Sequence, residues 1–247
     1  MSKTVVLITG GNRGLGEGLV KRYLALPKHT VIAGNRNPAH PTSKALWDLP
    51  VAAGSKLIVV KIDATVHQDA FDAVKELEGK HGIGHLDIVI ANAGICNAWP
   101  SVFDLKLSDL KAHEEANVYG FISLYQASRA LLKKSNEGPQ LISMGSNAGD
   151  LAKQPPIPNS AYGPTKAALN WFTIRINEED DWLNAWVMNP GWVQTELGNT
   201  GARALGLESA YITVDESCNG MVKTIASSSK GTFGGKKVLY TGHIEAW

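Results

Sequence analysis

Short apolar runs alternate along this chain with longer segments in which apolar residues recur every three or four positions. The first run, Val5 to Ile8, is continuous, as expected for a strand that is buried on both faces of a sheet. From Leu15 to Leu24 the apolar residues then follow helical spacing, and Pro27 ends the pattern. Strands and amphipathic helices in alternation predict βαβ units, in which helices cover a parallel sheet.

The remaining runs predict six further strands and two long helices. The expected strands cover residues 30–33, 57–62, 86–91, 140–144, 185–188 and 238–240. The helices run from about residue 108 past Asn117 to residue 132, and over residues 160–176. The Gly-rich region 191–212 is the least regular and is typical of a mobile lid. We therefore expect a single-domain Rossmann-type doubly wound α/β fold over residues 1–247, with about seven parallel strands and helices on both faces.

Composition and charge narrow the class of protein. Hydrophobic residues make up 44% of the chain and charged residues 19%, which is typical of a globular protein. A formal net charge of +1 gives no electrostatic reason to expect nucleic acid or a membrane surface as partner. No segment approaches the roughly 20 apolar residues that span a bilayer, and no signal peptide is recognisable. Cys96 and Cys218 are expected to be reduced thiols in the cytoplasm, and no Cys/His cluster has metal-ligand spacing.

A glycine-rich turn, Thr9 to Gly16, links the first strand to the first helix. Gly10 allows a sharp turn, Gly14 removes a side chain where a pyrophosphate would approach the backbone, and Gly16 lets the helix pack close to the sheet. The free N–H groups at the start of a helix favour an anion. Strand, glycines and helix in this order predict a dinucleotide site rather than a plain turn.

The spacing T-G-x-x-x-G-x-G resembles the short-chain dehydrogenase/reductase family, and further matches follow in order along the chain. They are Asn92-Ala93-Gly94, Asn117 in a long helix, a serine after the fifth strand, Tyr162-x-x-x-Lys166, and Pro190-Gly191 after the sixth strand. Three further stretches resemble fungal ketoreductases of the norsolorinic-acid-ketoreductase type. They are residues 80–87, residues 190–203, and the ending 240–243 with Trp247.

The end of the second strand predicts which nicotinamide cofactor binds. An acidic residue there would bind the ribose 2′-OH of NAD, but this chain has Arg36, a donor suited to a phosphate. Arg13 could reach the same phosphate from the glycine-rich turn. In the family such arginines imply NADPH; otherwise both are solvated surface residues. By the same resemblance Asp63 and the Ala64 backbone lie at the adenine, although Asp63 could equally cap a helix.

Tyr162 and Lys166 are four residues apart, so they share one face of a helix. A free phenol, with a pKa of about 10, is a poor acid at neutral pH. A nearby ammonium favours the phenolate and lowers that pKa, so the pair could form an acid catalyst. If Tyr162 and Lys166 only line the exposed face of a helix, the same spacing has no catalytic meaning.

The family resemblance implies a role for each residue of the catalytic set Asn117, Ser146, Tyr162 and Lys166. Ser146 would hydrogen-bond the substrate carbonyl, and Tyr162 would protonate it as hydride arrives. Lys166 would lower the tyrosine pKa and bind the nicotinamide ribose, while Asn117 would hold a water that links Lys166 to bulk solvent. The family usually has two adjacent serines, but Gly145 stands where the first would be, so Ser143 remains an alternative.

The resemblance also implies the remaining cofactor contacts. Asn92-Ala93-Gly94 would steady the central strand, and Val193 and Thr195 would contact the nicotinamide carboxamide; Thr195 could instead be a helix cap. The full expected cofactor set is Gly10, Asn12, Arg13, Gly14, Leu15, Gly16, Arg36, Asp63, Ala64, Asn92, Ala93, Gly94, Tyr162, Lys166, Pro190, Gly191, Val193 and Thr195.

The expected substrate pocket is apolar and aromatic. Loops beyond the strand carboxyl ends carry Cys96, Trp99, Met144, Trp192 and Leu197, with no arginine for a substrate carboxylate. This set predicts a bulky, hydrophobic or aromatic ketone, reduced at the expense of NADPH. The alternatives are an alcohol dehydrogenase working oxidatively and a non-redox NADPH-binding scaffold or cyclase. A homodimer or homotetramer is expected from the resemblance alone.

Overall fold

Eight strands form one sheet in the order β3-β2-β1-β4-β5-β6-β7-β8 in the computed structural model, which describes residues 3–247. The first seven strands run parallel, and β8 pairs with β7 in the antiparallel direction. The strands are β1 (Thr4–Thr9), β2 (His29–Asn35), β3 (Lys56–Lys61), β4 (Ile88–Ala91), β5 (Gln140–Met144), β6 (Asn184–Asn189), β7 (Lys237–Leu239) and β8 (Ile244–Glu245). All seven predicted strands are confirmed. The eighth is two residues long, too short to leave an apolar pattern.

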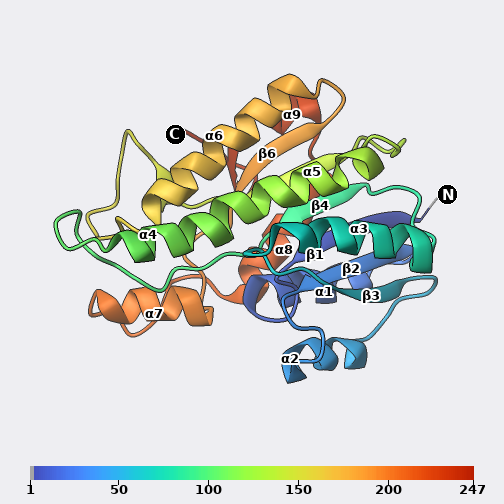
Figure 1. Cartoon of the computed structure of the whole chain (residues 1–247), viewed down its shortest axis with the longest axis horizontal. Coiled ribbons are helices and arrows are strands. Elements are labelled where there is room, and N and C mark those ends of the chain that lie inside the picture. Colours follow the sequence, from blue (N-terminus) through green and yellow to red (C-terminus); the bar gives the residue numbers. More distant parts are fainter. Residues whose placement is uncertain (1–2) are drawn as a thin grey trace.

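Helices cover both faces of this sheet, as predicted (Figure 1). The helical segments are α1 (Gly14–Leu24), α2 (Pro41–Lys44), η1 (Ala45–Asp48), α3 (His67–His81), α4 (Leu107–Glu114), η2 (Glu115–Tyr119), α5 (Gly120–Leu132), η3 (Asn147–Gly149), α6 (Gly163–Glu179), α7 (Glu196–Ala204), α8 (Val214–Ala226) and α9 (Lys230–Phe233). One buried core lies between the sheet and α3, α5 and α6, and the other lies between the sheet and α1 and α8.

The long helix predicted past Asn117 is built from α4, η2 and α5, which follow one another without a break across the front of the molecule (Figure 1). Its middle segment, η2, is a π-helix that contains Asn117. Single π-helical turns inside longer helices are rare and are frequent at functional sites. Apolar spacing alone could not distinguish this segment from regular α-helix.

The strand order reverses at the centre of the sheet, and this fixes where a ligand can enter. The chain builds β1, β2 and β3 outward in one direction and then returns to place β4 on the other side of β1. Beyond the carboxyl ends of parallel strands, such a reversal leaves a crevice between neighbouring loops. The glycine-rich turn after β1 and the Asn92-Ala93-Gly94 segment after β4 meet there.

Over residues 3–247, no helix combines the length and apolarity needed to cross a bilayer. In the same residues, no group of three or more His, Cys, Asp or Glu side chains is arranged to hold a metal ion. Cys96 and Cys218 are both free thiols.

Candidate active site

The glycine-rich turn leaves a cradle of backbone groups at the start of α1. Gly10 and Gly14 have φ values of 63° and 54°, in the left-handed region that side chains disfavour. A Cβ on Gly16 would collide with the Gly10 carbonyl oxygen and lie 2.7 Å from Asn92 Nδ2. Arg13 precedes α1 and makes no side-chain cap, so the first N–H groups of the helix are free for an anion. These features agree with the predicted phosphate-binding turn.

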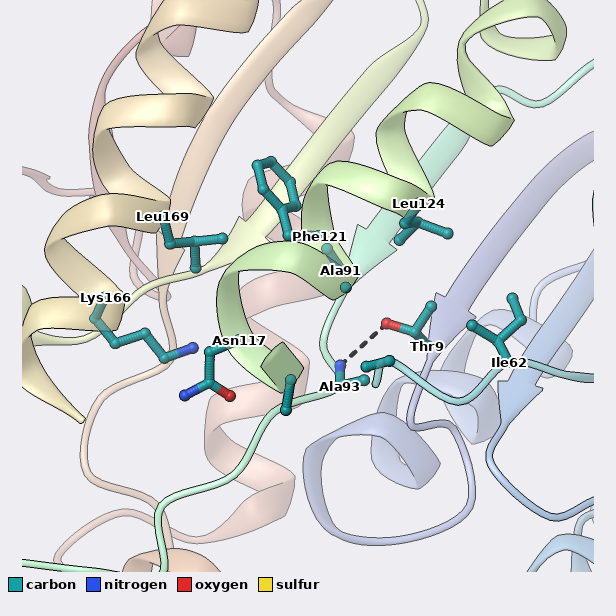
Figure 2. Close-up of a pocket in the computed structure, with 12 residues that line it drawn as sticks. Thr9, Ile62, Ala91, Ala93, Asn117, Phe121, Leu124, Lys166 and Leu169 are labelled. Carbon is teal, nitrogen blue, oxygen red and sulfur yellow. Dashed lines mark hydrogen bonds between the residues drawn. The ribbon is translucent and has the colours of Figure 1, made fainter. Parts of the chain in front are cut away.

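Asn92 and Ala93 hold the loop after β4 against β1. Thr9 Oγ1 accepts hydrogen bonds from the Asn92 and Ala93 N–H groups at 3.1 and 3.0 Å, and Figure 2 marks the second of these. Asn92 Nδ2 in turn donates to the carbonyl oxygens of Thr9 and Gly10, at 2.8 and 3.3 Å. The two strand ends at the crevice are therefore locked together, which agrees with the steadying role predicted for this segment.

A narrow cavity extends from this junction to Lys166 (Figure 2). Ile62 and Ala64 line one end, and Asn117 and Lys166 line the other. The Asp63 carboxylate accepts hydrogen bonds from the backbone N–H and the hydroxyl of Thr65. Asp63 is not a helix cap, because α3 begins at His67 after Val66. Ala64 lines the cavity, and the contact of Asp63 with the adenine stays a prediction.

The two arginines expected near the 2′-phosphate differ in their surroundings. Arg36 follows β2 and is exposed. Arg13 Nη1 is already paired with Glu196 Oε2 at 2.7 Å, across the gap between the glycine-rich turn and α7. Both groups of that pair are exposed to solvent. Asn12, from the same turn, donates from Nδ2 to Thr42 Oγ1 at 2.6 Å. Neither Glu196 nor Thr42 could be assigned to this region from the sequence.

Tyr162 and Lys166 lie at the start of α6. Tyr162 immediately precedes the helix, and Lys166 follows one turn later. The Lys166 Nζ lies 5.4 Å from the centre of the Tyr162 ring and donates to the Met144 carbonyl oxygen at 2.8 Å. The predicted juxtaposition is present, and α6 directs both side chains toward the crevice beyond the strand ends.

The pKa of Tyr162 moves in the direction opposite to that predicted from sequence. Burial raises the pKa of this phenol above its ordinary value, interaction with Cys96 raises it further, and a hydrogen bond with Ser146 lowers it. Burial also lowers the pKa of Lys166 to about 8, because the ammonium is costly to desolvate. The surroundings of the phenol therefore outweigh any stabilisation that the amine gives the phenolate.

The structure separates the two candidate serines. Ser143 is fully buried in β5, and its hydroxyl pairs with Thr173 Oγ1 at 2.8 Å. Ser146 precedes the η3 turn, accepts a hydrogen bond from the Ala148 N–H at 3.1 Å, and lies close enough to the Tyr162 phenol to lower its pKa. A side chain on Gly145 would collide with Val187 Cγ1, which explains why a glycine replaces the usual first serine. The geometry favours Ser146 as the functional serine.

Asn117 is buried beneath the same site, with its amide bound on several sides. Its Nδ2 donates to the Ile95 carbonyl oxygen and to Thr165 Oγ1, each at 3.0 Å, and its Oδ1 accepts from the Ile95 N–H at 2.8 Å. The amide of Asn117 thus ties η2 to the loop after β4 and to α6. Figure 2 shows this amide beside the Lys166 amine.

The predicted pocket residues lie on the loop after β4, which carries Cys96 and Trp99, on the segment after β6, which carries Trp192, and on α7, which carries Leu197. Cys96 interacts electrostatically with Tyr162 and Lys166, and burial raises the pKa of its thiol to about 12. The Trp99 indole lies 3.8 Å from where a Cβ on Gly201 would be, so the loop after β4 faces α7. Leu197, on α7, is 41% exposed, which leaves an apolar surface open at this side.

The segment after β6 carries the last group of predicted residues. Gly191 has a φ of 78°, and Trp192 donates from Nε1 to the Gly198 carbonyl oxygen at 3.1 Å. Val193 is buried and bridges to Ile212. Thr195 caps α7 by accepting from the Gly198 N–H at 3.0 Å. The cap considered for Thr195 is thus present, and the region predicted as irregular contains an ordered helix.

Comparisons with known proteins agree with this geometry. A family model described as "short chain dehydrogenase" matches residues 4–206. The chain is 40% identical to a norsolorinic acid ketoreductase of Dothistroma septosporum, over 96% of this chain and 90% of that protein. It is 36% identical to the norsolorinic acid ketoreductase of Aspergillus parasiticus, over 97% and 89%. An NADPH-bound carbonyl reductase from chicken fatty liver superposes over 100% of both chains, with a TM-score of 0.88 and 28% identity.

Proposed function

Because the chain belongs to the short-chain dehydrogenase family, we propose that it is an NADPH-dependent reductase of ketones in bulky hydrophobic or aromatic molecules. The observation that carries this proposal is the cluster of Tyr162, Lys166 and Ser146 beside a glycine cradle, at the carboxyl edge of the sheet. The names of the fungal relatives and of the chicken carbonyl reductase support the same reaction. All 247 residues would act as one domain.

The residues around the cradle fit a dinucleotide. A Cβ would fill the space at Gly16, and the first N–H groups of α1 are free to bind a pyrophosphate. Arg36, exposed and without an acidic neighbour in its own loop, suits a 2′-phosphate better than a ribose hydroxyl. Ala64 and Asn92 to Gly94 would border the adenosine half, and Val193 and Thr195 the nicotinamide. When bound, NADPH supplies the hydride.

Tyr162 is proposed as the proton donor. A phenol whose pKa is raised by burial stays protonated at neutral pH, and this is the form that a donor needs. The reduced carbonyl oxygen is an alkoxide, a stronger base than phenolate, so the proton moves to it favourably. The Lys166 ammonium, 5.4 Å from the ring centre, would then stabilise the phenolate that remains.

Ser146 and Asn117 would support this step. Ser146 lies within hydrogen-bond reach of the phenol, so its hydroxyl could hold the same carbonyl oxygen and stabilise the charge that develops there. Asn117 would position a water for the return of a proton through Lys166. Because both N–H groups of the Asn117 amide already donate, to Ile95 and Thr165, the amide could not donate to that water. The water would instead donate to Oδ1, which also accepts from the Ile95 N–H, or to an η2 backbone carbonyl.

The surface around the phenol suggests the substrate class. Cys96 interacts with the phenol, Trp99 on the same loop faces α7, and Trp192 and Leu197 come from the segment after β6 and from α7. Flat aromatic side chains with few charges favour a flat, apolar ketone. Oxidation of the alcohol would use the same groups. The ratio of reduced to oxidised cofactor would decide in which direction the reaction runs. A non-redox scaffold would not need the Tyr162–Lys166 pair, which is present in this chain.

Two measurements test this function. Purified protein is given NADPH and a panel of aromatic and short aliphatic ketones, and NADPH absorbance is followed. We expect turnover of bulky aromatic ketones, whereas a preference for short aliphatic ketones would contradict the pocket assignment. Tyr162→Phe should bind NADPH as the parent does and lose at least about 100-fold in turnover. Unchanged turnover in Tyr162→Phe would remove this phenol from the mechanism.

A further inference from the structure

A buried lysine that the reaction scheme does not use lies directly behind the Ser146 turn. Lys237, on β7, has a side chain that is only 1% exposed. Its Nζ lies 2.5 Å from Asp150 Oδ1, 3.4 Å from Asn147 Oδ1 and 3.7 Å from Glu245 Oε2. One buried ammonium therefore faces two carboxylates and an amide oxygen, which come from two other segments of the chain, the η3 turn and β8.

Two of these partners belong to the turn that carries the proposed functional serine. Asn147 is the first residue of the η3 turn and Asp150 follows its last, while Ser146 caps its start. On its other side this turn packs against α6, since a Cβ on Gly149 would lie 2.7 Å from the Lys166 carbonyl carbon. The turn is thus held between the Lys237 cluster and the helix that carries Tyr162 and Lys166.

The same cluster reaches the loop expected at the nicotinamide. Asn189 Nδ2 donates to Asn147 Oδ1 and to Glu245 Oε2, each at 2.7 Å. Asn189 Oδ1 accepts from the Gly191 N–H at 3.1 Å. A chain of hydrogen bonds therefore runs from Lys237 through Asn147 and Asn189 to Gly191.

We propose that Lys237 is a positioning residue, which fixes the Ser146 turn against α6 through Asp150 and Asn147. This inference rests on the proposed function only for the role of Ser146. Without the ammonium, the Asp150 and Glu245 carboxylates would remain partly buried with no cation between them, and such a pair is strongly unfavourable. The turn would move to hydrate them and would carry Ser146 away from Tyr162.

A half-buried lysine whose ammonium is bound by backbone carbonyls offers a control. Lys230, on α9, donates to the carbonyl oxygens of Asn177, Asp180 and Leu183, at 2.6 to 3.1 Å. It ties the end of α6 to the chain before β6, remote from Ser146. Lys230→Met therefore removes an ammonium that also makes several hydrogen bonds, and lowers stability without touching the η3 turn.

The test compares Lys237→Met, Lys237→Arg and Lys230→Met in the full chain, with wild-type turnover as the separate test of the reductase function. We expect Lys237→Met to lower kcat for the ketone at least 30-fold while the NADPH Kd changes less than threefold. Lys237→Arg, which keeps the charge, should have a kcat at least tenfold higher than that of Lys237→Met. Lys230→Met should keep the wild-type kcat. Equal kcat in the two methionine variants would overturn the proposal.

Amide hydrogen exchange gives a readout that needs no turnover. The N–H groups of Ala148, Gly149 and Asp150 bond within the Ser146 turn. They should exchange at least tenfold faster in Lys237→Met than in Lys230→Met. Where Lys237→Met does not fold, Asp150→Asn replaces it, and unchanged exchange and kcat in that variant would also overturn the proposal.

Discussion

The amide of Asn117 binds both backbone groups of Ile95: Nδ2 donates to its carbonyl oxygen at 3.0 Å, and Oδ1 accepts from its N–H at 2.8 Å. This pair joins the π-helical segment η2 to the loop that carries Cys96. This buried side chain therefore helps to place the loop, together with the hydrogen bond from the Asn97 N–H to His113 Nε2 at 3.3 Å.

Replacing Asn117 by leucine should be costly. The change removes three hydrogen bonds and leaves the Ile95 groups without partners, so the free energy of unfolding should fall by about 3 kcal/mol. Asn170→Leu is the control, because the buried Oδ1 of Asn170 has no partner among the residues described. Denaturant unfolding of both variants measures the difference, and equal losses would show that the Asn117 bonds contribute little.

Removing Arg36 should change cofactor choice. Arg36→Ala should weaken NADPH binding by about 10- to 100-fold, because one charge-assisted hydrogen bond to the 2′-phosphate is lost, and should change NADH binding less than threefold. Fluorescence titration gives both dissociation constants. Arg175→Ala, which removes an exposed arginine paired with Glu179 on α6, serves as the control. Equal weakening of NADPH and NADH would contradict the cofactor assignment.

The rate of ketone reduction should fall as pH rises through about 8. Burial lowers the pKa of Lys166 to about 8, so its ammonium is present below that pH and is lost above it. Above that pH, deprotonation of Lys166 therefore removes the cation that stabilises the Tyr162 phenolate. Turnover at saturating NADPH, measured from pH 6 to about 10, checks the sign. Lys166→Arg keeps its charge and should move the decline to higher pH; a profile that stays flat to the upper limit would contradict the role of the ammonium.

Gly145 and Val187 should be energetically coupled. Gly145→Ser alone should cost about 1–3 kcal/mol of stability, because the new side chain meets Val187 Cγ1. In Gly145→Ser/Val187→Ala the hydroxyl gains room, and Asn170 Oδ1 lies 3.6 Å from the new Cβ. Unfolding free energies of both single variants and the double variant form a cycle, with an expected coupling of about 1 kcal/mol or more. Strict additivity would mean that Val187 does not restrict this position.

Local sequence rules predicted the parts of the site that are local in the chain. The turn from Thr9 to Gly16 depends on glycines at fixed offsets, and Tyr162 and Lys166 approach each other because they are four residues apart. The strands could be predicted equally well, since apolar runs of four to six residues are long enough to show a pattern. These features need no knowledge of the rest of the molecule.

Contacts between distant segments could not be predicted in this way. The Arg13–Glu196 pair and the Lys237–Asp150 pair join residues 183 and 87 positions apart. The direction of the Tyr162 pKa depends on how much protein surrounds the phenol, which spacing does not reveal. The π-helical η2 and the folded-back carboxylate of Asp63 likewise reflect neighbours that only the assembled fold supplies.

The outer strands of the sheet limit how copies of this protein can associate. At one rim, β3 carries the exposed residues Lys56 and Lys61 at its two ends; at the other, β8 is a two-residue strand that runs against its neighbour. Short and lysine-bearing rims discourage strand addition from a second chain. Self-assembly would therefore proceed through helical surfaces rather than by extending the sheet, and the protein should resist fibril-like stacking while it remains folded.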